Sequence, residues 1–315
     1  MLYSGRISGD VTDLARNAAR AAQASLEAAV TKMEPAPVHR SLGCEDFERQ
    51  VASVGCTTCD CDAGKGVMRM IWTDSLQIEV PRARVPDGVR IYAIGDVHGR
   101  VDLLDQVLSR IGVDLATHPT ANAVLVFLGD YIDRGPASKD VLDRLITCCA
   151  TRPTVCLIGN HETYLCEFLR NPEILSAWRQ YGGLNTLLSY GIRPSIESDP
   201  QERVKLAQAL DRALPPSHRQ FLNNLKPYFV CGDFFFVHAG VRPGVPLTDQ
   251  SEKDLLWIRE EFLLYEDSFG KIIVHGHTPV LEPEIRANRI SIDTGAYATG
   301  RLTCLVLEGD DVGFV

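Results

Sequence analysis

The stretch Arg90-Ile91-Tyr92-Ala93-Ile94-Gly95-Asp96-Val97-His98-Gly99 joins a short apolar run to a polar turn that carries an aspartate and a histidine. The same join recurs in residues Ala123–Gly135 and Thr154–Glu162. Apolar runs without alternating polar residues are typical of strands that are buried on both faces. After each turn, apolar residues recur at helical spacing, over Val101–Ile111, Ser138–Cys149 and His161–Leu169. Strand, turn and helix in repetition predict βαβ units with right-handed crossovers.

Residues 171–226 interrupt this repetition and carry no metal-type motif. They contain three helical patterns separated by Pro and Gly, around Glu173–Tyr190, Gln201–Ala213 and Ser217–Leu225. Strand patterns then return at Tyr228–Cys231, Phe234–His238, Ile272–His275, Ile285–Ile292 and Leu302–Leu307. Because these strands lie close together in sequence, we expect some of them to be antiparallel. The sequence therefore predicts an α/β fold of two mixed β-sheets packed as a sandwich, with helices outside and a helical insertion at 171–226.

Composition limits the classes of partner. The chain has 315 residues, 45% hydrophobic and 23% charged, which suits a soluble globular protein of one large or two small domains. Its net charge of −9 argues against binding to nucleic acid or to an anionic membrane. No apolar run reaches about 18 residues, so no membrane span is expected. The N-terminus is polar and lacks a signal-peptide core, which favours a cytoplasmic location.

Residues 1–85 lack strand patterns and are predicted to form an N-terminal extension, flexible or partly helical, before the main domain at 86–315. This extension holds the dense cluster Cys56-Thr-Thr-Cys59-Asp-Cys61. An exposed, oxidation-prone loop is the preferred interpretation, and a structural zinc site with Cys44 as fourth ligand is the alternative. The other six cysteines lie in apolar segments and are predicted to be small buried residues in a reducing compartment: Cys148, Cys149, Cys156, Cys166, Cys231 and Cys304.

Six side chains that follow apolar runs offer oxygen or imidazole nitrogen to a metal: Asp96, His98, Asp130, Asn160, His238 and His277. Asp130 can bridge two ions, because a carboxylate has two oxygens with several lone pairs. This mixed set suits Mn²⁺, Fe or Zn²⁺ rather than Ca²⁺. Two such ions about 3.5–4 Å apart lower the pKa of a shared water and hold phosphate oxygens.

Four further residues complete a hydrolytic site. His161 follows Asn160 and is placed to protonate a leaving alkoxide, and Asp133 is a candidate to orient its imidazolium. Arg134 can bind phosphate oxygens through two parallel hydrogen bonds, and Arg259 is a candidate for a second phosphate contact.

The runs GDVHG, GDYIDRG, GNHE, HAG and HGHT, in this order over roughly residues 88–310, resemble the phosphoprotein phosphatase branch of the calcineurin-like metallophosphoesterases. The resemblance implies a two-sheet sandwich flanked by helices. It also implies one ion held by Asp96, His98 and Asp130, and a second held by Asp130, Asn160, His238 and His277. Asp133 and His161 would be the catalytic pair, with Arg134 and Arg259 as phosphate ligands.

Two departures from the eukaryotic pattern, Ala239-Gly240 and His275-Gly276-His277, look like bacterial members. That group includes diadenosine tetraphosphate hydrolases, which usually lack the aspartate of Asp133-Arg134-Gly135. The resemblance therefore favours a serine/threonine protein phosphatase that hydrolyses phosphoproteins or small phosphate esters. Hydrolysis would proceed by direct attack of a metal-bound hydroxide, with two divalent ions, Mn²⁺ first and Fe or Zn²⁺ as alternatives. A dinucleoside tetraphosphate hydrolase is the alternative function.

Two further histidines and three further aromatic residues have predicted positions in the fold. His275 is predicted to pack in the core or support a ligand, and His218 to lie on the surface. Trp178 and Trp257 are predicted to be core residues, because each sits in an apolar pattern. Tyr297, near Asp293-Thr294-Gly295, is predicted either to approach the site or to join the core.

Overall fold

The computed structural model describes residues 83–120, 122–195 and 199–315. Ten strands form the framework: β1 (Val89–Ile94), β2 (Asn122–Phe127), β3 (Thr154–Cys156), β4 (Tyr228–Cys231), β5 (Phe234–Val237), β6 (Ile272–His275), β7 (Glu284–Ile285), β8 (Arg289–Ser291), β9 (Cys304–Glu308) and β10 (Asp311–Phe314). The helices are α3 (Val101–Thr117), α4 (Ser138–Thr151), α5 (Asn160–Phe168), α6 (Leu175–Gln180), α7 (Gly183–Ser189), α8 (Pro200–Ala213), α9 (Pro216–Asn223), α10 (Glu252–Trp257), α11 (Glu260–Leu263) and α12 (Ala296–Thr299), with a 3₁₀ turn at Pro172–Ile174.

The strands form two five-stranded mixed sheets, as predicted. The first has the order β10-β9-β1-β2-β3, in which β1, β2 and β3 are parallel, β9 is antiparallel to β1, and β10 is antiparallel to β9. The second has the order β4-β5-β6-β8-β7, in which β5, β6 and β8 are parallel and the two edge strands are antiparallel. The carboxyl ends of the parallel strands point to one end of the sandwich, where open α/β sheets place their sites.

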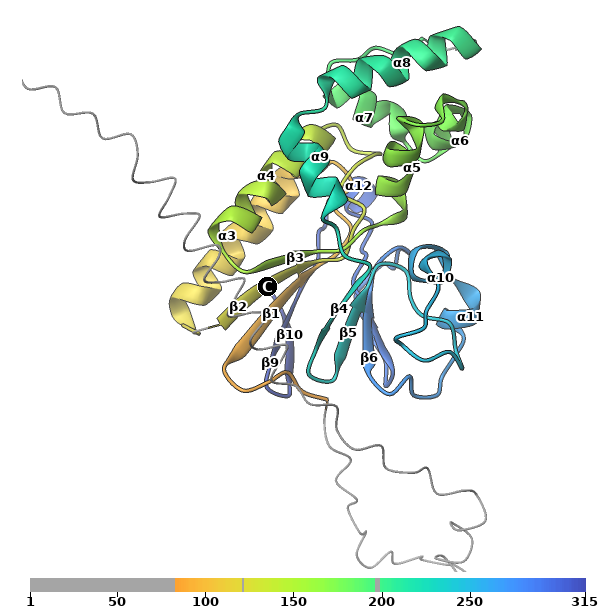
Figure 1. The fold of residues 1–315 in the computed structure, drawn as a ribbon. Coiled ribbons are helices and arrows are strands. Elements are labelled where there is room, and N and C mark those ends of the chain that lie inside the picture. Colours follow the sequence, from red (N-terminus) through yellow and green to blue (C-terminus); the bar gives the residue numbers. More distant parts are fainter. Residues whose placement is uncertain (1–82, 121, 196–198) are drawn as a thin grey trace, which may run out of the picture. The chain divides into compact units, whose positions relative to one another are not determined.

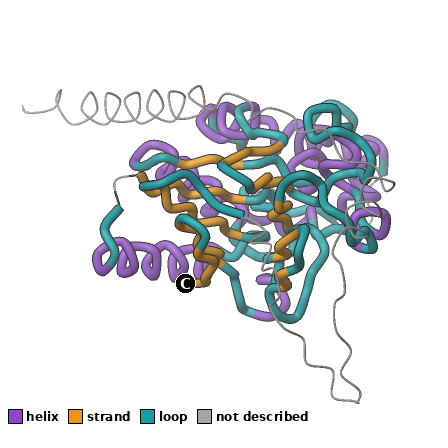
Figure 2. The backbone as a smooth tube through the Cα atoms, turned by 90° about the horizontal axis from the view of Figure 1, so that it is seen from below, coloured by secondary structure: helices purple, strands orange, loops and turns teal. Residues whose placement is uncertain are grey.

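Both faces of each sheet are buried, which explains why the strands show no polar alternation. Ile91 packs between the two sheets with Phe236, in one hydrophobic cluster. The next residue, Tyr92, points the other way and joins a cluster with Leu104 of α3. On the far face of the second sheet, Phe235 packs in a third cluster with residues of α10 and α11. Figures 1 and 2 show the strands gathered in the middle and the helices outside them.

The predicted insertion is helical and lies beyond the ends of β1, β2 and β3 in Figure 1. His218 of α9 is buried rather than exposed, so its surface prediction is wrong. Its Nδ1 lies 2.7 Å from the Tyr190 hydroxyl, and its Nε2 lies 2.9 Å from Asp143 Oδ1 of α4. The signal was its helical spacing from the buried Phe221 and Leu222, which places all three on one face. His218 therefore ties the insertion to the helix that covers the first sheet.

Three features of the secondary structure among the described residues differ clearly from the predictions. The stretch Ile285–Ile292 is divided between β7 and β8, which pair with each other through a turn. The pattern Glu173–Tyr190 is divided into a 3₁₀ turn, α6 and α7, and the positive φ of Gly182 lies at the last break. The last strand, β10, has no counterpart among the predictions.

The predictions for the N-terminal extension and its cysteine cluster lie outside the described residues, apart from residues 83–85. Val85 is fully buried, and its amide donates to the Gly309 carbonyl over 2.9 Å. No helix among the described residues is long and apolar enough to cross a membrane.

Candidate active site

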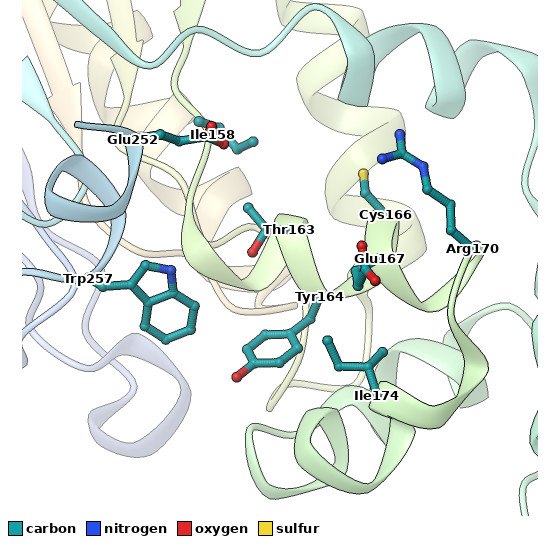
Figure 3. Close-up of a pocket in the computed structure, with 9 residues that line it drawn as sticks. All are labelled: Ile158, Thr163, Tyr164, Cys166, Glu167, Arg170, Ile174, Glu252 and Trp257. Carbon is teal, nitrogen blue, oxygen red and sulfur yellow. The ribbon is translucent and has the colours of Figure 1, made fainter. Parts of the chain in front are cut away.

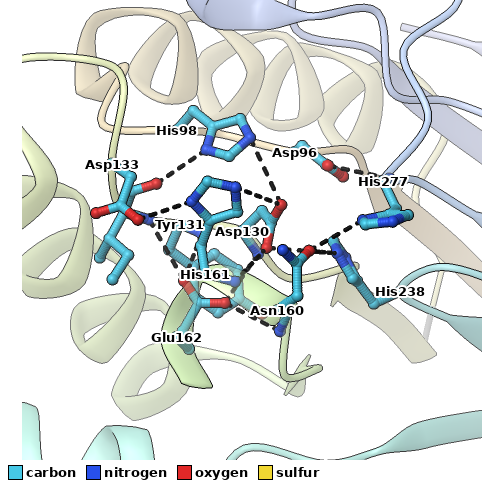
Figure 4. A network of polar contacts seen from close by, with 12 residues as sticks. Asp96, His98, Asp130, Tyr131, Asp133, Asn160, His161, Glu162, His238 and His277 are labelled. Atoms are coloured by element: carbon cyan, nitrogen blue, oxygen red, sulfur yellow. Dashed lines mark hydrogen bonds and ion pairs between the residues drawn. The ribbon is translucent and has the colours of Figure 1, made fainter. Parts of the chain in front are cut away.

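The six predicted metal ligands come from both sheets and meet at the strand ends (Figure 4). Asp96 and His98 follow β1, Asp130 follows β2, and Asn160 begins α5 just after β3. From the second sheet, His238 follows β5 and His277 lies two residues after β6. All six side chains are buried. Strands distant in sequence thus deliver one convergent set of oxygens and nitrogens.

Asp130 lies at the centre of this set. Its Oδ2 is 3.5 Å from His98 Nε2 and its Oδ1 is 3.4 Å from His238 Nε2. The Asn160 carbonyl oxygen lies 2.9 Å from His238 Nε2 and also 2.9 Å from His277 Nδ1. Two groups of potential ligands result, His98-Asp130-His161 and Asp130-His238-His277, in each of which the ligand atoms lie within 4.8 Å of one another.

The ring nitrogens of His98 and His238 that face Asp130 and the carboxylate oxygens of Asp130 are all hydrogen-bond acceptors. A cation bound between them would make their contact favourable. His98 Nδ1 donates to the Ile132 carbonyl over 2.9 Å and His238 Nδ1 donates to the Leu128 carbonyl over 3.0 Å. Burial lowers the pKa of His98 to about 3 and also lowers that of His238, so neither ring is doubly protonated. Each Nε2 therefore directs a lone pair at Asp130, an orientation typical of metal-binding histidines.

Other buried atoms fit the same conclusion. Asp96 Oδ2 accepts from the His277 amide over 3.0 Å, but Asp96 Oδ1 and His277 Nε2 have no hydrogen-bond partner among the described residues. Burial, with the charges of Asp293 and Asp130, raises the pKa of Asp96 well above its usual value. A divalent cation would relieve this repulsion. The residues present therefore fit a two-ion site of oxygen and imidazole ligands.

Backbone strain is concentrated at this site. Among the described residues, the non-glycine residues with positive φ are His98 (44°), Asp130 (51°), Asp133 (71°), Arg134 (63°) and His277 (65°). Such conformations cost free energy and persist where the surroundings enforce them. The strand-end turns thus hold their side chains in orientations that an unstrained turn would not give.

Two glycines make room for the ligands. A Cβ on Gly276 would lie 2.1 Å from Asp96 Oδ1, and a Cβ on Gly159 would lie 2.2 Å from Asp130 Oδ1. Any side chain at these positions would displace a carboxylate. The glycines of the GNHE and HGHT runs are therefore required by close packing against the ligands.

His161 and Asp133 form the predicted pair. His161 Nδ1 lies 2.7 Å from Asp133 Oδ2, and His161 Nε2 lies 3.7 Å from Asp130 Oδ2. Burial lowers the pKa of His161, but the Asp130 and Asp133 carboxylates outweigh it, and the net pKa is raised. A protonated imidazole facing the candidate metal ligands is suited to donate a proton to a leaving oxygen.

Asp133 is itself fixed by the insertion. Its Oδ2 accepts from the Trp178 indole N–H over 2.7 Å, and its Oδ1 accepts from the Thr186 hydroxyl. Trp178 is fully buried, as the sequence predicts, and it also orients the site. Its partner could not be read from the sequence, because 45 residues separate the two.

Trp178→Phe is expected to lower kcat about tenfold while leaving KM nearly unchanged. Phenylalanine keeps the aromatic packing but removes the N–H, and a hydrogen bond to a charged group contributes about 1.5–3 kcal/mol. Steady-state kinetics together with a thermal melt checks this expectation. Phe168→Leu, a change beside Trp178 that leaves the indole donor intact, is the control. An unchanged kcat in Trp178→Phe would show that Asp133 needs no such support.

Glu162 of the GNHE run supports the site, a role that the sequence analysis does not predict. Its fully buried carboxylate accepts from the backbone amides of Asp130, Tyr131 and Gly159 over 2.8–2.9 Å. It thereby holds the turn after β2 against the start of α5. The available signal was a glutamate at the third position of a helix, where it reaches back to the helix N-terminus.

The two predicted phosphate-binding arginines border the ligands. Arg134 stacks on Tyr297 with its guanidinium carbon 4.5 Å from the ring centre, and Tyr297 also meets the His98 ring edge-on at 5.4 Å. Tyr297 thus approaches the site, one of its two predicted positions. Arg259 is exposed and donates to Thr278 Oγ1 over 3.0 Å. Burial lowers the pKa of His277, and the charge of Arg259 contributes in the same direction.

Three aromatic side chains form a cluster at the edge of the site. Tyr164 and Tyr181 are stacked with their ring centres 5.1 Å apart, and Trp257 meets the Tyr164 ring edge-on at 5.8 Å. The cluster reaches two candidate site residues: the ring centres of Tyr181 and His161 are 6.0 Å apart, and those of Trp257 and His277 are 6.2 Å apart. Trp257 is only half-buried, so its prediction as a core residue is wrong. His275, in contrast, packs against Phe262 in the core as predicted.

Several known proteins are similar to this chain in sequence or in fold. A bis(5′-nucleosyl)-tetraphosphatase PrpE (asymmetrical) of Anoxybacillus flavithermus is 28% identical over 241 residues, which cover 67% of this chain and 88% of that protein. A protein of the same name from Oceanobacillus iheyensis is 26% identical, over 68% of this chain and 87% of its own. Among solved structures, the cold-active protein-tyrosine phosphatase of a psychrophile Shewanella is similar with a TM-score of 0.46 and 16% identity, over 73% of this chain and 83% of its own. A sequence model described as calcineurin-like phosphoesterase matches residues 89–304. The chain therefore belongs to the calcineurin-like phosphoesterase family, and it is a metallophosphoesterase-type hydrolase.

Proposed function

We propose that this protein hydrolyses bis(5′-nucleosyl) tetraphosphates, with two divalent ions held by the six residues that meet around Asp130. The observation that carries this proposal is the cluster of Tyr164, Tyr181 and Trp257 beside the candidate metal ligands. The names of the two curated relatives support it. In the sequence analysis, the presence of Asp133 favours a protein phosphatase and makes the tetraphosphate hydrolase the alternative. The proposal made here reverses that order.

The aromatic cluster borders a cavity of about 500 Å³ (Figure 3). Tyr164 and Trp257 line it, together with Thr163, Glu167 and Arg170. Aromatic faces stack on any nucleobase, and stacking contributes about 1–3 kcal/mol per base. Side chains such as Thr163 and Glu167 offer hydrogen-bonding groups for the sugar or for base edges. The cavity thus combines a stacking surface with polar groups, as a nucleoside site needs, and Trp257 links it to His277 of the candidate metal site.

The residues of this chain divide the work between them. Bound divalent ions would lower the pKa of a water molecule and hold oxygens of the phosphate under attack. Arg134 and Arg259 would bind further phosphate oxygens and offset the charge of the tetraphosphate. His161, held by Asp133, would donate its Nε2 proton to the leaving oxygen. Trp257 would position one nucleoside.

The test is a comparison of kcat/KM for three substrates with the full chain loaded with Mn²⁺. We expect diadenosine tetraphosphate to be preferred at least about tenfold over a phosphoserine peptide and over p-nitrophenyl phosphate. Ion-exchange chromatography of the products would report cleavage to nucleoside tri- and monophosphate. A preference for the phosphopeptide by the same margin would overturn the proposal.

A second candidate, a serine/threonine phosphoprotein phosphatase, is favoured by the His161–Asp133 pair. Alkoxides are strong bases and need a proton from the enzyme as they leave, whereas a polyphosphate leaves readily without one. A buried pair 2.7 Å apart is therefore better explained by a phosphoserine or phosphothreonine substrate. The substrate comparison above separates the two candidates.

Trp257→Ala is expected to raise KM for diadenosine tetraphosphate about tenfold or more, since it removes one stacking surface. The rate with p-nitrophenyl phosphate should change much less, because the small substrate does not need the cavity. Initial-rate kinetics on both substrates measures the difference. Phe314→Ala, which removes an exposed aromatic ring on β10, is the control. Equal losses on both substrates would argue that Trp257 only supports His277.

A further inference from the structure

Cys149 and Cys156 lie side by side on the covered face of the first sheet. Cys149 is near the end of α4 and Cys156 ends β3, and their Sγ atoms are 3.8 Å apart. Cys156 is buried, but Cys149 is exposed, so its prediction as a buried residue is wrong. The reason is its position on α4, where the neighbouring Cys148 takes the inward face. An exposed thiol therefore contacts a buried one.

Small molecules can reach this pair. Both cysteines line a cavity of about 610 Å³ between α4, β3 and α9, which also includes Thr154, Gln220 and Lys226. The contact with the Cys156 thiol lowers the pKa of Cys149, whereas burial raises the pKa of Cys156 well above its usual value. Cys149 is thus the more reactive thiol, and Cys156 is within reach to resolve its oxidation.

We propose that Cys149 and Cys156 are a modification site at which a peroxide forms an intramolecular disulfide. The Cys149 thiol loses its proton, and the thiolate attacks one peroxide oxygen and breaks the O–O bond; the hydroxide that leaves takes up that proton, which gives a sulfenic acid and water. The Cys156 sulfur then attacks the Cys149 sulfur; the S–S bond forms, the S–O bond breaks, and the hydroxyl leaves as water with the Cys156 proton. Two thiols are oxidised, and one hydrogen peroxide is reduced to two waters.

The disulfide would act on the strand that leads into the active site. The sulfur atoms must approach from 3.8 Å to about 2.05 Å, so the two side chains must rotate or the ends of α4 and β3 must shift. Cys156 lies four residues before Asn160, and the Leu157 carbonyl accepts from the hydroxyl of Tyr131, the neighbour of Asp130. We therefore expect oxidation to lower activity several-fold and a thiol reductant to restore it. This site is independent of which phosphate substrate the enzyme takes.

Sequential alkylation of the full, Mn²⁺-loaded chain tests the proposal. After treatment with hydrogen peroxide, free thiols are blocked with iodoacetamide, disulfides are reduced, and the released thiols are labelled with N-ethylmaleimide. Because Pro153 follows Arg152, trypsin leaves Cys148, Cys149, Cys156 and Cys166 on one peptide, and fragmentation must locate the labels. We expect N-ethylmaleimide on Cys149 and Cys156 together.

Three variants make the result specific. Cys149→Ser and Cys156→Ser should each abolish the label on the remaining partner and the reductant-reversible loss of activity. Cys148→Ser, a change at the neighbouring position, should leave both unchanged. A label on Cys148 with Cys156, or a sulfinic acid on Cys149 without a disulfide, would overturn the proposal. A disulfide that forms without any change in the rate of hydrolysis would overturn the proposed effect on activity.

Discussion

His161→Asn is expected to lower kcat for a phosphoserine peptide by about 10²–10⁴-fold, the range typical of a lost general acid. Asparagine keeps a polar group near Asp133 but cannot carry the proton. The loss should be smaller for p-nitrophenyl phosphate and for diadenosine tetraphosphate, because nitrophenolate and polyphosphate leave without protonation. Steady-state kinetics on the three substrates gives the ratio of the losses.

The ratio matters because His161 also lies in one of the two groups of potential metal ligands, with His98 and Asp130. If His161 held an ion, the variant would lose metal and lose activity equally on all substrates. Metal content, measured by mass spectrometry on the dialysed protein, should stay the same in the variant and the wild type. Equal rates for the wild type and the His161→Asn variant with p-nitrophenyl phosphate would instead indicate a protein that binds phosphate compounds without hydrolysing them.

Asp130→Asn is expected to weaken metal binding at least about 100-fold and to abolish measurable turnover. Changing a residue that only supports a metal ligand already costs 10–100-fold in affinity, and Asp130 itself belongs to both ligand groups. Burial alone would raise the pKa of Asp130, but the charge of the nearby His161 imidazolium is the largest effect that lowers it, and the net pKa is below its usual value. The amide keeps the shape and removes the charge of the carboxylate.

Titration calorimetry with Mn²⁺ measures the loss, and a thermal melt confirms that the variant folds. Asp140→Asn, an exposed carboxylate in the first turn of α4, is the matched control and should bind as the wild type does. Unchanged stoichiometry and affinity in Asp130→Asn would contradict the assignment of Asp130 as the shared ligand.

The sheets and the ligand set could be predicted from the sequence because their signals are local. Each ligand follows an apolar strand directly, and parallel strands bring their carboxyl ends to one edge. The short, uninterrupted run before Asp130 also indicated a strand buried on both faces, as β2 is. Patterns of this kind need no knowledge of how distant segments meet.

What could not be predicted depends on contacts between distant segments. Trp178 was expected in the core, yet nothing in its helical pattern indicates that its N–H meets Asp133. Trp257 has apolar neighbours, but it faces the Tyr164–Tyr181 stack instead of the interior. The partition of Ile285–Ile292 into β7 and β8 also depends on how the two strands pair, which apolar content alone does not encode.

The hydrogen bond from the His277 amide to Asp96 joins residues 181 positions apart and has a consequence for synthesis on the ribosome. Because chains grow at about 5–20 residues per second, His277 is added to the chain on the order of ten seconds or more after Asp96. During that interval the nascent chain presents unpaired carboxylates and imidazoles from its first half. Any selection of a metal that depends on all six candidate ligands can therefore take place only after the second sheet has folded.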